Sequence, residues 1–88
     1  MDAAYYEELK ALSARVVRAA PNDLGANQMR AMVLSGLSGA WEEGPRSAAE
    51  LKKAATHFDR AAALSTAPAW KVELSSLADL CRSRADAL

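Results

Sequence analysis

One histidine and one cysteine are the residues of this 88-residue chain best suited to catalysis or metal binding. A histidine acting as a general base needs a neighbouring group that orients its ring. At three and four positions along a helix, the neighbours of His57 are Lys53, Ala54, Arg60 and Ala61. None of these side chains can orient a neutral imidazole. We therefore expect His57 to lie at the surface, beside a buried Phe58.

The other reactive groups also favour structural roles. Cys81 shares an apolar helical stripe with Leu74 and Leu77, which predicts a buried thiol acting as a small apolar side chain. The acidic pairs Glu7-Glu8 and Glu42-Glu43 are adjacent in sequence, so on a helix their carboxylates would point about 100° apart. A single histidine with a single cysteine excludes most metal sites. The sequence therefore predicts a protein that is not an enzyme and holds no cofactor or metal.

Charge and hydropathy exclude further classes of protein. Eleven basic and eleven acidic residues give zero net charge, which argues against binding to a nucleic-acid backbone. The acidic N-terminal segment lacks the features of a secretory signal, and no apolar run approaches the ~18 residues of a membrane span. The lone Cys81 fits a reducing compartment. We expect no membrane or nucleic-acid partner and a cytoplasmic location.

Helix-breaking residues divide the chain into four segments of helical length. Alanine accounts for 21 residues, isoleucine is absent and valine occurs four times, which favours helix over strand. Pro21, the Gly44-Pro45 pair and Pro68 separate the segments. The expected helices cover about 3–20, 23–40, 48–64 and 68–87. The fold prediction for 1–88 is a single all-α domain of four antiparallel helices in two stacked hairpins.

Apolar spacing and capping residues predict how these helices begin and pack. Ser47 and Glu50 form a capping box that begins the third helix. The segment from Trp41 to Arg46 has the composition of an exposed loop. Apolar side chains form one stripe along the first helix, at Tyr5, Leu9, Leu12, Val16 and Ala19. A similar stripe follows the last helix, at Trp70, Leu74, Leu77, Cys81 and Leu88.

Two short motifs resemble the tetratricopeptide repeat (TPR), a helix–turn–helix unit of about 34 residues. Ala54, Phe58 and Ala61 have the small–aromatic–small spacing of its second helix, and 19–23 (Ala-Ala-Pro-Asn-Asp) resembles the junction between repeats. Ala31 falls where the first helix of a repeat has a small residue. The resemblance covers about 12–70 and implies that the middle two helices form one repeat. A generic helical bundle is the alternative.

The TPR resemblance implies a non-enzymatic protein–protein interaction module, a fragment of a helical scaffold. Its partner, a helix or peptide, would lie in an apolar groove on the second helix formed by Gln28, Met29, Met32 and Ser35. Trp41, beside the acidic loop, is a further candidate contact. Methionines make adaptable apolar contacts, although Met29 and Met32 would also serve as core filler. Because helical repeats generally need about three units, the alternative is a helical-bundle homodimer with a structural or regulatory role. It would form through Met29/Met32 or Trp70/Leu74.

Overall fold

Four α-helices make up the part of the chain that the structure, a computed structural model, describes, namely residues 3–36 and 46–88. The helices are α1 (Ala3–Ala19), α2 (Leu24–Ser35), α3 (Ala48–Leu64) and α4 (Pro68–Asp86). No strand occurs in these residues, which confirms the all-α prediction for them. Their helices also contain no segment long and apolar enough to cross a membrane.

The second helix is shorter than its sequence predicts. It begins at Asp23, whose carboxylate accepts a hydrogen bond from the backbone N–H of Ala26 at 2.8 Å. It ends at Gly36, which adopts the left-handed conformation at φ 75°. Glycine enters this region without the Cβ clash that other residues suffer, so it terminates the helix. Helix α2 therefore does not continue through Gly36, and the rest of the expected extension, to residue 40, lies outside the described residues.

Capping begins α3 as predicted but begins α4 differently. Ser47 Oγ accepts from the Glu50 N–H at 3.1 Å, and Glu50 Oε1 accepts from the Ser47 N–H at 2.9 Å, which confirms the capping box. Pro68 lies in the first turn of α4, where a missing N–H removes no helical hydrogen bond. The N-cap of α4 is Ala67 and makes no side-chain cap; Ser65 Oγ instead accepts from the Ala67 N–H at 3.2 Å.

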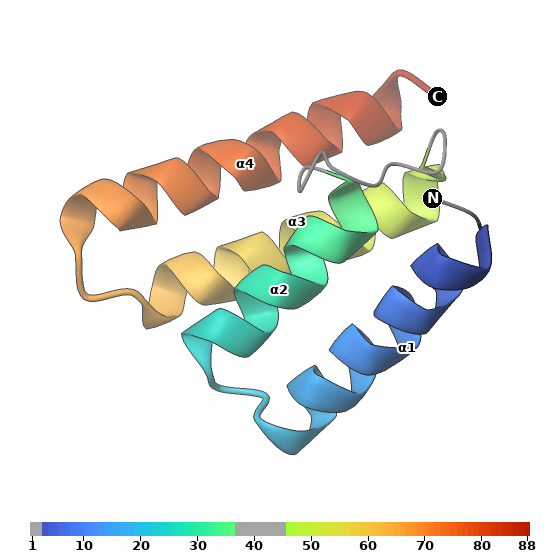
Figure 1. Ribbon diagram of the computed structural model, residues 1–88. Helices are drawn as coiled ribbons and strands as arrows, with labels where there is room; N and C mark the ends of the chain where they lie inside the picture. The colour runs from blue at the N-terminus through green and yellow to red at the C-terminus, as the bar shows by residue number, and fades with distance from the viewer. Residues whose placement is uncertain (1–2, 37–45) are drawn as a thin grey trace.

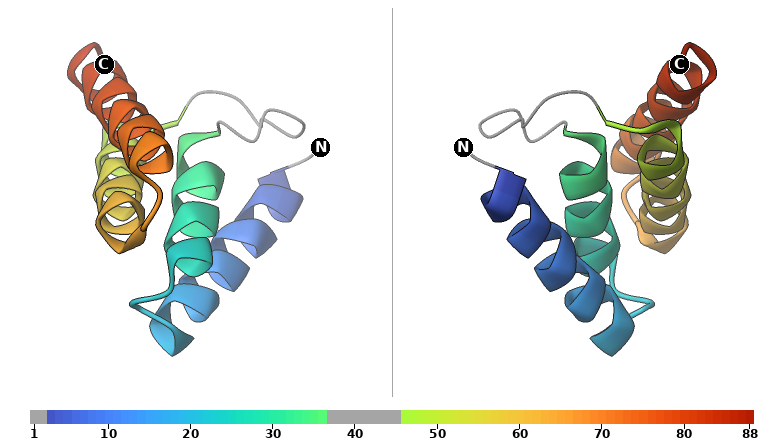
Figure 2. Two further views of the ribbon diagram at one scale, coloured as in Figure 1. Left: turned by 90° about the vertical axis from the view of Figure 1, so that its left-hand side faces the viewer. Right: turned by 90° about the vertical axis from the view of Figure 1, so that its right-hand side faces the viewer.

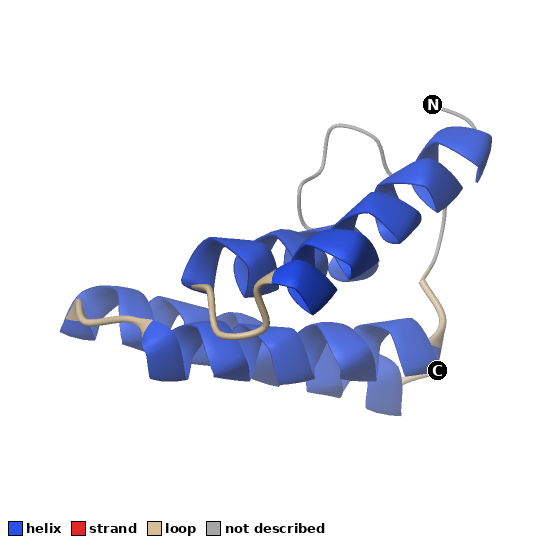
Figure 3. Ribbon diagram, turned by 90° about the horizontal axis from the view of Figure 1, so that it is seen from below, coloured by secondary structure: helices blue, strands red, loops and turns tan. Residues whose placement is uncertain are grey.

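The helices pack in the order in which they occur in the chain. α1 contacts α2, α2 contacts α3, and α3 contacts α4 (Figure 1). Figure 2 shows α1 and α4 at opposite sides of this array, with α1 diverging from α2 away from the turn that joins them. Figure 3, seen from below, shows α3 and α4 lying along each other. The arrangement is an open row of helices, so α1 and α4 each have one side without a helical neighbour from the described residues.

The core lies between α2, α3 and α4 and is built mainly from alanines around one aromatic ring. Phe58 and its neighbours Ala54 and Ala61 have no exposed surface, as the small–aromatic–small motif predicts. Cys81 is 1% exposed, which confirms its assignment as a buried thiol. The remaining members of this core are Ala31, Leu34, Ala55, Ala62, Leu74 and Ala78.

The predicted apolar stripes of the two outer helices are wrong in part. On α1, Tyr5 and Leu12 are 39% and 40% exposed, while Tyr6 and Ser13 are buried. The packed face of α1 is thus rotated from its apolar stripe, because polar contacts hold this helix to the others. On α4, Trp70 is 38% exposed, whereas Leu74 is fully buried.

Two arginines differ from their expected surroundings. Arg46, predicted in an exposed loop, is buried, and its guanidinium carbon lies 3.9 Å from the centre of the Tyr6 ring. Arg82 lies four positions before Asp86, a spacing that allows an ion pair along one helix, but it pairs with Asp59 on α3 and with Asp79 at 3.6 Å. The Arg82–Asp59 pair therefore joins the two neighbouring helices rather than two turns of one helix.

Candidate functional site

The residues of α2 that are predicted to contact a partner differ in exposure. Gln28, Met29 and Met32 are half-buried, and Met32 also packs against the apolar core. Ser35 is 3% exposed, and its hydroxyl donates to the Met32 carbonyl at 3.2 Å. Ser35 therefore offers a partner little surface, and Trp41 lies outside the described residues. Among the residues the structure describes, Gln28 and the two methionines are therefore the predicted partner contacts that keep accessible surface.

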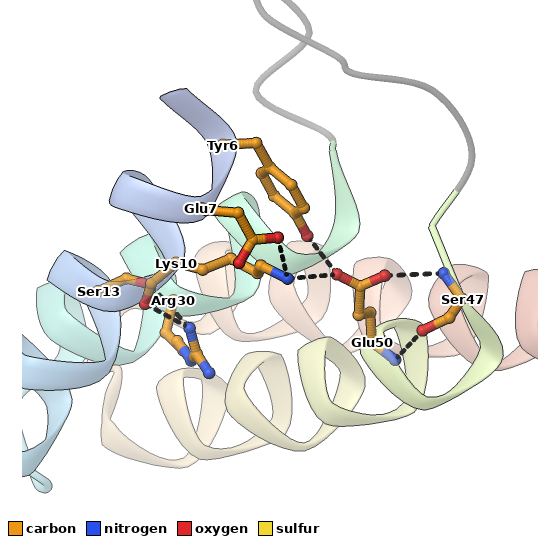
Figure 4. A network of polar contacts seen from close by, with 7 residues as sticks. All are labelled: Tyr6, Glu7, Lys10, Ser13, Arg30, Ser47 and Glu50. Atoms are coloured by element: carbon orange, nitrogen blue, oxygen red, sulfur yellow. Dashed lines mark hydrogen bonds and ion pairs between the residues drawn. The ribbon is translucent and has the colours of Figure 1, made fainter. Parts of the chain in front are cut away.

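A second cluster of side chains joins the start of α1 to the start of α3 (Figure 4). We call Tyr6, Lys10, Ser47 and Glu50 the Glu50 cluster. Glu50 Oε2 accepts hydrogen bonds from the Tyr6 hydroxyl at 2.6 Å and from Lys10 Nζ at 3.4 Å. Lys10 Nζ also pairs with Glu7 at 3.0 Å and lies 4.7 Å from the centre of the Tyr6 ring. One carboxylate thus caps its own helix, α3, and holds α1 to it.

The Glu50 cluster moves the pKa of each acid away from neutral pH. Burial raises the pKa of the Glu50 carboxyl, but hydrogen bonds from Ser47 and Tyr6 outweigh it and lower that pKa to about 2. Burial, and then the hydrogen bond to Glu50, raise the pKa of the Tyr6 hydroxyl. Near pH 7 Glu50 is therefore ionised and Tyr6 neutral. Their shifts separate the two pKa values further, which suits a structural contact and not proton transfer.

Arg30 makes the polar connection between α1 and α2. Its Nη1 donates to the Lys10 carbonyl at 2.8 Å and to Ser13 Oγ at 3.0 Å. Ser13 has no exposed surface, and its hydroxyl donates to the Lys10 carbonyl at 3.1 Å. Burial lowers the pKa of the Arg30 guanidinium, which remains charged at any pH where the protein is folded. Hydrogen bonds therefore attach α1 at positions where its sequence places no large apolar side chain.

His57 is oriented by a residue of another helix, a contact that its neighbours along α3 do not predict. Asn27 is fully buried, and its Nδ2 donates to the carbonyls of Pro21 at 3.0 Å and Asp23 at 2.9 Å. These two bonds fix the amide so that Oδ1 faces His57 Nδ1 at 2.9 Å. Since Oδ1 only accepts, the neutral ring must carry its proton on Nδ1. Burial, followed by the charges of Arg30, Arg60 and Lys53, lowers the pKa of His57.

One sequence signal could have found this pair. Asn27 lies four and seven positions before Ala31 and Leu34, on the face of α2 that the core covers. A polar residue on a buried face requires hydrogen-bond partners. The neighbours of His57 on its own helix do not reveal this partner, because Asn27 comes from α2. The sequence has no comparable signal for the burial of Tyr6, because the apolar spacing of the first helix selects its neighbour Tyr5.

The arrangement offers little for covalent or metal chemistry in the part of the chain described. Burial raises the pKa of the Cys81 thiol despite the nearby charges of Arg84 and Arg82, so it remains protonated at neutral pH. No group of three or more histidine, cysteine or acidic residues is placed to hold a metal within residues 3–36 and 46–88. The side chains with distinctive surroundings instead bind one another and connect helices.

Comparison with protein-family models, with curated proteins and with solved structures finds no match to this chain.

Proposed function

We propose that the chain is a TPR-like protein–protein interaction module, with antiparallel helices in two stacked hairpins and a partner groove on α2. The packing of the motif residues carries this proposal. Ala31, Ala54, Phe58 and Ala61 all have no exposed surface, as close helix–helix approach around one ring requires. The ordered row α1–α2–α3–α4 also suits repeats that contact only their neighbours.

The partner in this proposal is a helix or extended peptide with apolar anchors. Met29 and Met32 are half-buried on a helix that otherwise packs against α1 and α3. Partly exposed methionines form adaptable apolar surfaces that suit such anchors. Gln28 lies one turn from Met32 and adds amide groups that can hydrogen-bond a peptide backbone. No step in this function involves catalysis, a cofactor, a nucleic acid or a membrane.

A peptide selected from a random library against the purified protein tests this proposal. We expect the amide NMR signals of Gln28, Met29 and Met32 to shift on binding. Met29→Glu should weaken binding about tenfold or more, because a charge enters an apolar contact. Ser75→Glu, on the exposed surface of α4, is the matched control and should bind like the wild type. A groove on α2 would be refuted if the selected peptides shifted the NMR signals of other surfaces and bound the Met29→Glu variant as tightly as the wild type.

Exposed apolar side chains favour one second candidate, the homodimer with a structural or regulatory role. On α4, Trp70 is 38%, Leu80 40% and Val72 67% exposed. The sequence predicts a dimer face that contains Trp70 and Leu74. Leu74 is fully buried, so it cannot contribute to this face. Solution mass at two concentrations separates the two functions. A monomer whose melting temperature does not depend on concentration would eliminate the dimer.

A further inference from the structure

A pocket of about 160 Å³ lies where α1, α2 and α3 meet. Its lining combines three cations with one carboxylate and two apolar side chains: Lys10, Arg30, Lys53, Glu50, Leu34 and Ala49. In Figure 4, Lys10 and Glu50 approach each other from α1 and α3, and Arg30 reaches towards α1 from α2. The chain as a whole has zero net charge, so this excess of positive charge is local.

The carboxylate of the pocket is already engaged by Lys10, which also lines the pocket, and by two uncharged donors. Glu50 Oε1 accepts from the Ser47 N–H, and Oε2 accepts from Tyr6 and Lys10. Within the described residues, the ion pairs of Glu50 and Glu7 are with Lys10, and neither Arg30 nor Lys53 joins them. The bonds of Arg30 Nη1 involve one of its three guanidinium nitrogens. Arg30 and Lys53 therefore retain charge and N–H donors that Glu50 does not engage.

The positive charge extends along α3 beyond the pocket. Lys53, His57 and Arg60 are spaced by four and three residues, so they share one face of the helix. The charges that lower the pKa of His57, after burial, are those of Arg30, Arg60 and Lys53. The charges of three cationic side chains, one from α2 and two from α3, therefore all act on the His57 ring.

We propose that this pocket binds a phosphate monoester, held by Lys53 and Arg30 and by the surrounding positive charge. A phosphate monoester carries close to two negative charges and three terminal acceptor oxygens at pH 7. Arginine matches such oxygens in a bidentate geometry, and lysine supplies a point charge. The pocket volume of about 160 Å³ is many times the space that one water needs, so the pocket can admit a phosphate group.

This site is separate from the partner groove. Arg30 and Met32 are two residues apart on α2, and so point about 160–200° apart around the helix. The phosphate site can therefore be tested independently of the apolar groove, and failure of either leaves the other standing.

Two adjacent lysines provide a matched test. Lys53 lines this pocket, whereas Lys52 lines a different one with Thr56, Arg82 and Asp86. Inorganic phosphate, glycerol 3-phosphate and a phosphoserine peptide would each be titrated at low salt and followed by amide NMR. We expect saturable shifts around the pocket, about fivefold weaker in Lys53→Gln and within about twofold of wild type in Lys52→Gln. Equal weakening in both variants, or shifts that do not saturate, would overturn the proposal.

The single histidine supplies an independent readout. A bound dianion opposes the charges of Arg30, Arg60 and Lys53, so saturating phosphate should raise the pKa of His57 by about half a unit. An unchanged His57 pKa at saturation would contradict the site. Tighter binding of the phosphoserine peptide assigns the source as a phosphorylated protein, and tighter binding of glycerol 3-phosphate assigns a small phosphorylated molecule. Equal binding of a peptide with glutamate in place of phosphoserine would refute phosphate as the ligand.

Discussion

Replacing Phe58 with alanine should remove a large part of the folding free energy. Phe58 has no exposed surface, and truncation of buried phenylalanine costs about 3–5 kcal/mol. The upper part of this range applies here, because Ala54 and Ala61 flank the ring and Ala31 belongs to the same core. Alanine side chains have no rotamers with which to fill the space left by the ring. An 88-residue domain has a total stability of about 4–13 kcal/mol, so the variant should lose about a third of it or more.

Urea unfolding followed by circular dichroism at 222 nm measures this loss. Phe58→Leu keeps most of the apolar volume and should cost less than half as much as Phe58→Ala. Leu12→Ala, on the exposed side of α1, should cost under about 1 kcal/mol, since Leu12 is 40% exposed. If Phe58→Ala cost under about 1 kcal/mol, or no more than Leu12→Ala, the ring would not hold the core together.

Three further predictions concern the polar contacts between helices. Because the pKa of Glu50 is about 2 in the folded protein and higher when unfolded, its contribution is complete above about pH 5 and is lost as the pH falls towards 2. Glu50 is partly exposed, so Glu50→Gln should reduce the urea-measured loss of stability between pH 6 and pH 3 by about 1–2 kcal/mol; equal acid sensitivity in the two proteins would contradict this. Tyr6→Phe should cost about 1–2 kcal/mol in thermal unfolding, and the exposed Tyr5→Phe under about 0.5 kcal/mol; the reverse order would place the wrong tyrosine in the interface. In neutral His57, nitrogen NMR should find the proton on Nδ1. Asn27→Ala should remove this preference for one tautomer and lower the free energy of unfolding by about 2–3 kcal/mol. A wild-type ring protonated on Nε2 would mean that the oxygen and nitrogen of the Asn27 amide are exchanged.

Local signals in the sequence predict the helices and much of the core. Proline positions, the Ser47–Glu50 capping box and the spacing of Ala54, Phe58 and Ala61 each depend on residues within a few turns of one another. The end of α2 at Gly36 is not predicted, because a single glycine is also tolerated within a helix. The positive φ of Gly36 depends on the direction in which the chain leaves the helix. Helical propensity does not describe that direction.

The polar contacts depend on which helices become neighbours, so they could not be predicted from one helix at a time. Glu50 was correctly assigned to the capping box, yet its second oxygen binds Tyr6, 44 residues earlier in the chain. Likewise His57 finds Asn27 across 30 residues. The groove on α2 remains a prediction, with Met29 and Met32 half-buried as such a surface requires.

The attachment of α1 shows how a helix can be packed on a polar face and leave its apolar stripe accessible. Apolar spacing alone would place Tyr5 and Leu12 inside, since burying them gains about 25 cal/mol per Å². The structure instead buries Tyr6 and Ser13, because each finds a hydrogen-bond partner on the neighbouring helices. Leaving either group unpaired in the interior would cost about 1–3 kcal/mol, so these bonds also determine how α1 is rotated. Tyr5 and Leu12 consequently remain 39% and 40% exposed, although apolar spacing places them on the face that would be buried.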